Sequence, residues 1–236
     1  MCEIFSGHII TDKEHKDWGK VIYLSGIHHE KDREKIHKEY GKDIKLAAWQ
    51  TKKYASFKNR FEITTSVGDI AEKEKKELLS LLDKWKDSQN AEELFLKLVS
   101  ITQGGVPLAR DKFTLDLENL IIATEENNLV FDFSEVKGFT FNTGPGCTFK
   151  TGYDCTFNTG SGCTFKTGYD CTFNTDSSCT FKTGYDCTFN TGSGCTFNTG
   201  SGCVCVRRDV YEVIEIPENK KIKLNGPGVK GYKEIK

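Results

Sequence analysis

An eight-residue repeat dominates the second half of the sequence. Cysteine recurs at every eighth position from Cys147 to Cys203, and each cysteine up to Cys195 is followed by Thr-Phe. Most repeats then continue with Thr-Gly or with a related small, polar corner. A fixed short period with glycine between the repeats is typical of a solenoid, in which one structural unit stacks on copies of itself. The sequence therefore predicts a solenoid for this half of the chain.

The octads are of two alternating kinds. Each begins with alternating apolar and polar residues, which is typical of a β-strand that turns its Cys and Phe side chains to one face. One octad supplies only one strand and one corner, so a closed coil needs two. Lysine and asparagine alternate at the fourth position, and Tyr-Asp corners alternate with corners of the Ser-Gly type. We therefore predict a two-sided parallel β-solenoid with coils of 16 residues.

The inward-facing positions of these coils are expected to form ladders of Phe and Cys. Cysteine serves there as a small apolar side chain. The same frame is expected to extend upstream with Phe139 and Phe131 in place of cysteine, which gives five coils between Phe131 and Cys203. The predicted ladder residues are Cys147, Phe149, Cys155, Phe157, Cys163, Phe165, Cys171, Phe173, Cys179, Phe181, Cys187, Phe189, Cys195 and Phe197.

Both ends of the solenoid need a cap, because a terminal coil exposes unpaired strand groups. Leu115 to Leu117 lies 16 residues before Phe131 to Phe133, so a degenerate first coil is expected there. Residues 210–216 and 220–224 are expected to form a hairpin around Pro217 at the other end. The predicted domains are a head over residues 1–105, the solenoid with its first capping coil over 106–206, and the C-terminal hairpin cap over 207–236.

The head is predicted to be α/β, which makes the whole chain α+β. A charged helix is expected over residues 29–40, since Gly41 is a usual helix stop. Two further helices are expected to begin after Asp69 and Asn90, each with a glutamate three residues later that completes a capping box. The expected strands are residues 3–10, 19–24, 44–49 and 60–66.

Composition favours a protein of the cytoplasm. The chain has 33 basic and 34 acidic residues, which gives no net attraction to nucleic acid or to a membrane surface. No apolar run reaches the length of a membrane span, and no secretory signal is visible, so no membrane contact is expected. Eight of the ten cysteines share one ladder position with parallel Cβ vectors, a geometry that suits disulfides poorly. Reduced thiols are therefore expected.

Histidines offer one candidate site in the head. His28, His29 and Glu30 lie where a strand is expected to lead into a helix, and His8 lies on a neighbouring strand. Imidazole and carboxylate groups of this kind can bind zinc or another transition metal. The alternative is that these are surface histidines on a charged helix. We predict no cofactor, except for a metal ion if these four residues converge.

A basic, aromatic segment offers a second candidate. Residues 42–61 contain six basic residues and one acidic residue, with four aromatic residues between them. Such interleaving suits contact with phosphates and stacking on bases, and equally suits contact with a protein. The alternative is a solvated loop whose aromatic rings turn into the core. The residues expected to bind a partner are Lys52, Lys53, Tyr54, Lys58 and Arg60.

The Cys-Thr-Phe-x-Thr-Gly octads, the exit segment Arg207 to Tyr211 and the segment Gly26 to Arg33 resemble a group of octapeptide-repeat proteins of bacteriophages and their hosts. The repeats, which cover about a third of the chain, are the most specific part of this resemblance. The resemblance implies a viral accessory protein in the cytoplasm of the infected cell, many of which bind a host enzyme or defence component. It implies no catalytic residues.

The sequence therefore supports two functional hypotheses. The first is a non-enzymatic interaction protein that binds a host protein through the head and uses the solenoid as a rigid spacer or a dimer contact. Inhibition of a host defence system is one such role. The second is an enzyme, metal-dependent or binding a nucleotide or nucleic acid, with its site in the head. Metal analysis of the purified protein separates the two.

Overall fold

The computed structural model describes residues 6–23, 29–51, 61–63, 72–134 and 136–236. The chain forms two compact units, Met1–Leu96 and Lys97–Lys236. The boundary precedes the predicted one at residue 105, because Ser100–Gln103 forms a strand (β5) that pairs with the solenoid. The two units, the head and the solenoid, are described separately.

The head contains a four-stranded sheet in the order β2-β1-β3-β4. Its strands are β1 (Ser6–Ile10), β2 (Val21–Tyr23), β3 (Leu46–Thr51) and β4 (Phe61–Ile63), and its helices are α1 (His29–Tyr40), α2 (Glu72–Asp87) and α3 (Ala91–Leu96). These elements match the predicted order. All three strand pairings are antiparallel, so the head is of the α+β type rather than α/β.

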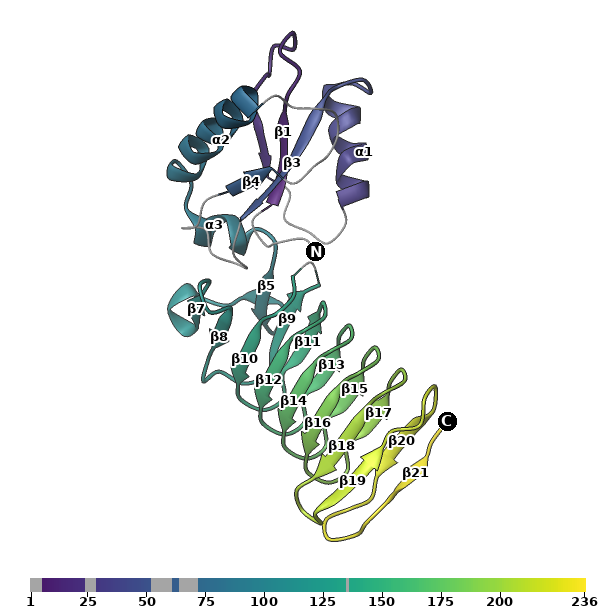
Figure 1. The fold of residues 1–236 in the computed structure, drawn as a ribbon. Helices are drawn as coiled ribbons and strands as arrows, with labels where there is room; N and C mark the ends of the chain where they lie inside the picture. The colour runs from purple at the N-terminus through teal and green to yellow at the C-terminus, as the bar shows by residue number, and fades with distance from the viewer. Residues whose placement is uncertain (1–5, 24–28, 52–60, 64–71, 135) are drawn as a thin grey trace. The chain divides into compact units, whose positions relative to one another are not determined.

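Alternation along β1 gives the head a core on each face of its sheet. Ile9 packs with Leu78 and Leu82 of α2, whereas Ile10 packs with Ile36 of α1. The two helices therefore lie on opposite faces of the sheet (Figure 1). The predicted cap of α3 is confirmed, since the Asn90 Oδ1 accepts hydrogen bonds from the backbone N–H groups of Glu92 and Glu93. The predicted cap at Asp69 lies outside the described residues.

The solenoid consists of two parallel sheets joined by alternating corners (Figure 1). We call them sheet B and sheet C. Phe141 stands in register with Phe157, and Phe149 with Phe165, which confirms the coil of 16 residues. Sheet B contains β9 (Leu129–Phe133), β11 (Thr148–Thr151), β13 (Thr164–Lys166), β15 (Thr180–Lys182) and β17 (Thr196–Asn198). Sheet C contains β8 (Ile121–Ala123), β10 (Thr140–Thr143), β12 (Thr156–Thr159), β14 (Thr172–Thr175), β16 (Thr188–Thr191) and β18 (Val204–Arg207).

The core of the solenoid consists of stacked rings. All fourteen predicted ladder residues are buried, with at most 1% of each exposed. Within one ladder, Phe149 and Phe165 stack with centroids 5.1 Å apart, while Phe149 meets Phe157 of the other ladder edge-on at 5.2 Å. Both arrangements suit the quadrupole of an aromatic ring. Each buried Phe contributes about 1.5–3 kcal/mol through burial alone, so these ladders dominate the stability of the solenoid.

The two corner types obtain their left-handed residue in different ways. At the Tyr-Asp corners, Asp154 and Asp170 have φ of 59° and 53°. At the other corners glycine takes this conformation, as Gly162 does with φ of 71°, except at residues 176–178, where Ser178 takes it with φ of 63°. Aspartate is among the few non-glycine residues that adopt this region readily. The sequence therefore meets one backbone requirement with aspartate at the Tyr-Asp corners and with glycine or serine at the other corners.

The octad frame is wrong at Phe131. Phe149 stands in register with Phe131, eighteen residues earlier (149 − 131), and not with Phe133. The connection between β9 and β10 is two residues longer than the other corners, and this length shifts the frame. Phe139 does occupy a cysteine position, because its carbonyl accepts a hydrogen bond from Thr156 N as the Cys155 carbonyl does from Thr172 N.

Antiparallel strands close the N-terminal end. β5 (Ser100–Gln103) pairs with β9 and places Ile101 opposite Phe131, and β6 (Val106–Pro107) pairs with β5. β7 (Thr114–Asp116) pairs with β8 and places Leu115 opposite Ile122. The degenerate coil expected at Leu115 is therefore wrong. The weaker copy of the repeat is β8 instead, whose Ile122 stands in parallel register with Phe141, and the antiparallel strand β7 then ends the sheet.

The C-terminal cap also consists of antiparallel strands. β19 (Glu212–Glu215) forms a hairpin with β18, and β20 (Lys221–Leu224) pairs with β17 and with β21 (Tyr232–Glu234). A hairpin cap is thus confirmed, but the expected pairing of 210–216 with 220–224 is wrong. These two strands extend different sheets, so that each sheet receives its own closing strand.

A buried arginine holds this cap together. The Arg207 guanidinium is fully buried and donates to both carboxylate oxygens of Asp209, at 3.2 and 2.7 Å, and to the Val229 carbonyl at 2.7 Å. Burial tends to raise the pKa of Asp209, but hydrogen bonds from Arg207 and Gly228 N outweigh it and lower the pKa. A buried charge needs such partners. Arg207 therefore ties the last loop of the chain to sheet C.

Deletion of whole coils tests this architecture. Removing residues 155–170 takes out one coil and leaves like corners stacked on like corners, so we expect a folded protein with a similar melting temperature. Removing residues 155–162 takes out half a coil and stacks Tyr-Asp corners on glycine corners. We expect this second deletion to lower the free energy of unfolding by several kcal/mol, on the order of one lost set of core contacts. Equal stability of the two deletion variants in urea unfolding would contradict a 16-residue coil.

Candidate functional site

The predicted histidine site is described only in part. His8 lies on β1 with 6% of its surface exposed, and its carbonyl accepts a hydrogen bond from Trp49 Nε1 at 3.1 Å. His28 lies outside the described residues, and His29 and Glu30 form the first turn of α1 without described side chains. Within the described part of the chain, no three His, Cys, Asp or Glu side chains are placed to hold a metal ion. Convergence of these four residues stays a prediction.

The predicted basic site lies between two paired strands. Lys52, Lys53, Tyr54, Lys58 and Arg60 connect β3 to β4 and lie outside the described residues. One aromatic residue of the segment, Trp49, turns into the core, where its ring meets Trp85 edge-on at 5.2 Å. Trp49 therefore agrees with the alternative interpretation, in which the aromatic rings of this segment pack in the core. The role of the five partner-binding residues stays a prediction.

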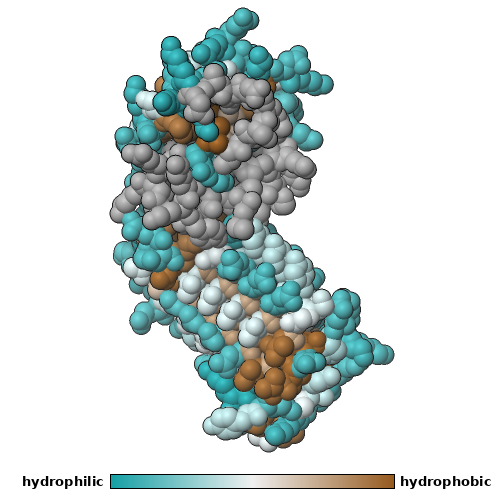
Figure 2. All heavy atoms as spheres, in the orientation of Figure 1, coloured by the Kyte–Doolittle hydropathy of each residue, from teal (hydrophilic) through white to brown (hydrophobic). Residues whose placement is uncertain are grey.

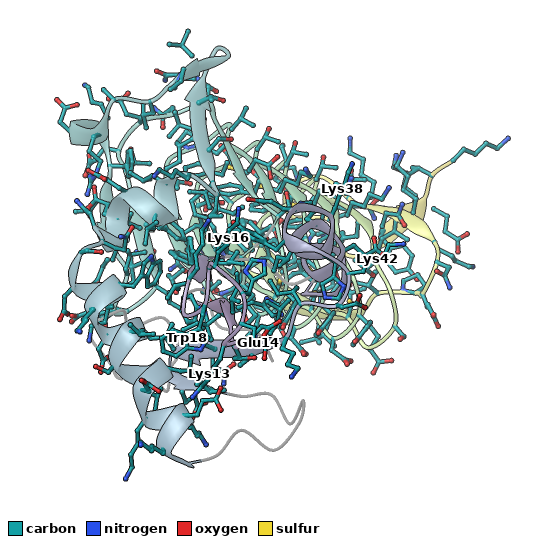
Figure 3. The ribbon with its side chains drawn as sticks, turned by 90° about the horizontal axis from the view of Figure 1, so that it is seen from above. Lys13, Glu14, Lys16, Trp18, Lys38 and Lys42 are labelled. Carbon is teal, nitrogen blue, oxygen red and sulfur yellow. The ribbon has the colours of Figure 1, made fainter. Side chains whose placement is uncertain are left out.

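The described head presents a group of lysines in two turns, of which only those from Lys42 onward belong to the predicted basic segment. Figure 3 shows Lys13 and Lys16 in the turn after β1, and Lys38 and Lys42 at the end of α1 and just beyond it. The two turns are joined by a hydrogen bond from Thr11 N to Lys45 O at 2.9 Å. Residues 11–20 and 37–45 together contain six lysines and five acidic residues. This surface is therefore of mixed charge and lacks the strong positive field typical of nucleic-acid binding.

The outer face of sheet C carries a regular ladder of amides, which we call the amide ladder. It consists of Asn142, Asn158, Asn174 and Asn190, which stand in register on successive strands. Asn158 Nδ2 donates to Asn142 Oδ1 at 2.8 Å, and Asn174 Nδ2 donates to Asn158 Oδ1 at 3.0 Å. Asn142, Asn158 and Asn174 are therefore linked along the face, whereas the Asn190 Oδ1 is buried without a partner among the described residues. Such a ladder stiffens the sheet and leaves unpaired groups chiefly at its ends.

The amide ladder stops where an apolar surface begins. Asn190 stands in register with Val206, and Val206 stands opposite Val213. Val206, Val213 and Tyr211 are 38%, 69% and 94% exposed. We call these three residues the C-terminal patch. Figure 2 shows apolar side chains gathered at this end of sheet C, beside the polar ladder.

A groove lined by polar and apolar residues lies at the other end of the amide ladder. It has a volume of about 660 Å³ and is lined by eleven residues, with Asn142 and Asn158 on one side and the segment from Asp111 to Thr114 on the other. Residues 123–125, at the end of β8 and just beyond it, complete the lining along with residues 143 and 144. The groove therefore lies wholly within the solenoid unit. The octad pattern gives no sign of it, because its outer wall belongs to the irregular N-terminal cap.

Comparison with family models, with curated proteins and with solved structures gave no match. No helix among the described residues is long and apolar enough to span a membrane.

Burial and hydrogen bonds between stacked thiols together set the pKa values of the cysteines. The thiols of Cys171 and Cys179 lower the pKa values of Cys155 and Cys195. All nine described cysteines are free, buried thiols, as the ladder spacing predicted. Burial raises the pKa of Cys205 to about 11. The hydrogen bond with the Cys171 thiol, together with burial, raises the pKa of Cys187 to about 11. Because the thiolate is the reactive form, Cys187 and Cys205 are poor nucleophiles near neutral pH. Burial limits the access of reagents to the other described thiols.

Thiol labelling tests this arrangement. We expect a thiol reagent at pH 8 to leave the nine described cysteines of the native protein largely unmodified and to label all ten cysteines after denaturation. An unfolded thiol ionises near about pH 8.5, whereas folded Cys205 ionises near 11. The unfolded state thus releases protons first, so the free energy of unfolding should fall as the pH rises from 8 to 10.

Cys205→Val provides the control, because it removes one titrating thiol and keeps an apolar side chain of similar size. Its free energy of unfolding should fall less between pH 8 and pH 10 than that of the unmodified protein. Rapid labelling of the native ladder, or a stability that rises over this range, would contradict the buried-thiol core.

Proposed function

We propose that this protein is a non-enzymatic interaction protein, in which the solenoid is a rigid unit that carries an apolar contact surface. The observation that supports this proposal is the C-terminal patch. Along sheet C the outward positions are threonine and asparagine on four strands, and then valine at positions 204 and 206. A polar residue would be tolerated at the exposed position 206, so valine there needs another explanation.

Contact with another protein supplies that explanation. Exposed apolar side chains that adjoin one another on a polar surface are typical of association sites. Val206 and Val213 are adjacent across the β18–β19 pair, and Tyr211 lies in the turn that joins the two strands. Tyrosine is also among the residues enriched at interface centres. The patch therefore has the composition of a small contact surface.

We propose that the head makes the selective contact. Its lysine-bearing turns have mixed charge and irregular shape, features that favour a protein partner over nucleic acid. The resemblance to phage octapeptide-repeat proteins makes a host protein of the cytoplasm the partner that we propose, and inhibition of a host defence system the role. A second contact through the solenoid, including one that joins two copies of the chain, would strengthen binding through avidity.

Substitutions in the C-terminal patch test the first part of the proposal. We expect Val206→Thr, Val213→Thr and Tyr211→Ser together to weaken self-association, or capture of the partner, by about ten-fold or more. The melting temperature should change little, because exposed positions contribute little to stability. Analytical ultracentrifugation and pull-down from host extract measure the two effects.

The matched control is Thr172→Ser with Asn174→Ser, which changes the same face two coils earlier and should leave association unchanged. If the unmodified protein is monomeric at high concentration and captures no partner, the patch is not a contact surface. The same conclusion follows if the patch variant and the control behave alike.

Charge reversal tests the role of the head. We expect Lys52→Glu, Lys53→Glu and Lys58→Glu together to weaken capture of the partner without lowering the melting temperature, because surface ion pairs contribute only about 0–1 kcal/mol. Lys73→Glu, Lys75→Glu and Lys76→Glu on α2 provide a control of equal charge. Capture that is lost equally in both triple variants would indicate a general effect of charge rather than a contact at residues 52–58.

A further inference from the structure

The groove at the N-terminal end of the amide ladder has the properties of a ligand site. We propose that it binds a neutral, hydroxyl-rich ligand, a short oligosaccharide. This site is distinct from the C-terminal patch, because it lies at the other end of sheet C. Its lining residues belong to the N-terminal cap, to the strands β8, β10 and β12, and to the corner after β10.

The outer wall of the groove is held in place by its own contacts. Thr124 Oγ1 donates to the Lys112 carbonyl at 2.7 Å, and Thr114 Oγ1 donates to the Ala123 carbonyl at 3.3 Å. The Lys112 ammonium pairs with Glu126 at 3.0 Å. These three contacts join the two segments of the wall, and Thr124 N donates to the Asn142 carbonyl at 3.0 Å, which ties the wall to β10. A site that is formed before the ligand arrives loses less entropy on binding.

The groove presents hydrogen-bond donors that are not used elsewhere. Asn142 Oδ1 accepts the hydrogen bond from Asn158, so the Asn142 amide group ends the ladder with its Nδ2. The Asn142 Nδ2 donates a hydrogen bond to no described residue. Asn158 uses one N–H in the ladder and retains a second. Both side chains line the groove, so at least two amide N–H groups face a ligand there.

The groove also presents acceptors. Asp111 and Glu125 line it, both are exposed, and neither carboxylate forms a hydrogen bond or an ion pair with a described residue. Lys112 is already paired with Glu126, and Arg110, the neighbouring basic residue, donates to the Phe113 carbonyl at 2.6 Å. The unpaired charged groups of the lining are therefore both negative.

This combination of groups selects the class of ligand. Two unpaired carboxylates repel phosphates and other anions, so a nucleotide does not fit. A calcium ion requires six to eight oxygen ligands, many more than two carboxylates supply, and the amide N–H groups would oppose it. A polyamine would satisfy the carboxylates but would offer no acceptor to the amides. A sugar hydroxyl both donates and accepts, so it matches both sets of groups.

The size of the groove agrees with a short oligosaccharide. Pockets for small ligands measure about 300–1,000 Å³, and this groove measures about 660 Å³. Beyond it, the threonine and asparagine side chains of sheet C continue along the solenoid with a spacing of one strand, about 4.8 Å. A longer saccharide would therefore meet further hydroxyl and amide groups outside the groove.

Titration calorimetry on the full-length protein tests the proposal. The probes are cellotetraose, maltotetraose and the N-acetylated chitotetraose, with ATP and spermine as the anionic and cationic controls. At least one tetrasaccharide should bind. The pair Asp111→Asn and Glu125→Gln should weaken its binding by about ten-fold or more, the loss typical of hydrogen bonds to charged groups. Thr114→Trp, which fills the groove from an exposed strand position, should abolish binding.

The control pair is Asp170→Asn and Glu215→Gln, which removes two exposed carboxylates elsewhere on the solenoid and should leave saccharide affinity unchanged. All variants should keep the melting temperature of the unmodified protein. The proposal is overturned if none of the three tetrasaccharides binds, or if binding is equal in the groove and control variants. It is also overturned if ATP or spermine binds and the substitution Thr114→Trp abolishes that binding.

Discussion

The stacking of phenylalanine rings along the solenoid is the interaction on which the second unit depends. Rings such as Phe157 and Phe173 lie 4.9 Å apart and almost parallel, at the spacing that neighbouring strands impose. Rings of the two ladders also meet edge-on, so one coil accommodates two phenylalanines and the thiols beside them. The corners follow from this core, since each must turn the chain within four residues to return the next phenylalanine to its place. Aspartate and glycine in the left-handed region meet that requirement.

The repeat could be predicted from the sequence because each position of the octad has one physical role. Phe149 and Cys155 are buried wherever their octad occurs, so period and face follow from composition alone. The ends could not be read in this way. Phe131 keeps its place in a ladder while the connection after it gains two residues, and Leu115 pairs with an antiparallel neighbour. A cap must cover the unpaired edge of a sheet. Many different sequences can do so, and therefore the repeat period does not predict the structure of the cap.

The candidate sites show the same division. Sequence patterns indicated His28 and the basic segment around Lys53 as candidate sites. Both lie outside the described residues. The groove and the C-terminal patch appear only when distant segments come together. Asp111 meets Asn142 because β7 folds back on β8, and Val206 meets Val213 because β19 reverses onto β18. Both surfaces lie where the repeat ends. A uniform ladder of threonine and asparagine presents the same groups along its whole length, whereas its two ends present other side chains.

Hydrogen exchange measured by mass spectrometry tests the central claim, that stacked aromatic ladders make the solenoid one cooperative, rigid unit. Strand amides from Thr156 to Phe197 should be the slowest to exchange, and they should become labelled together when the native protein is held near its unfolding midpoint. Bimodal mass envelopes shared by peptides from β12, β14 and β16 would be the signature. Rapid exchange in these strands, or independent exchange of neighbouring coils, would contradict the claim.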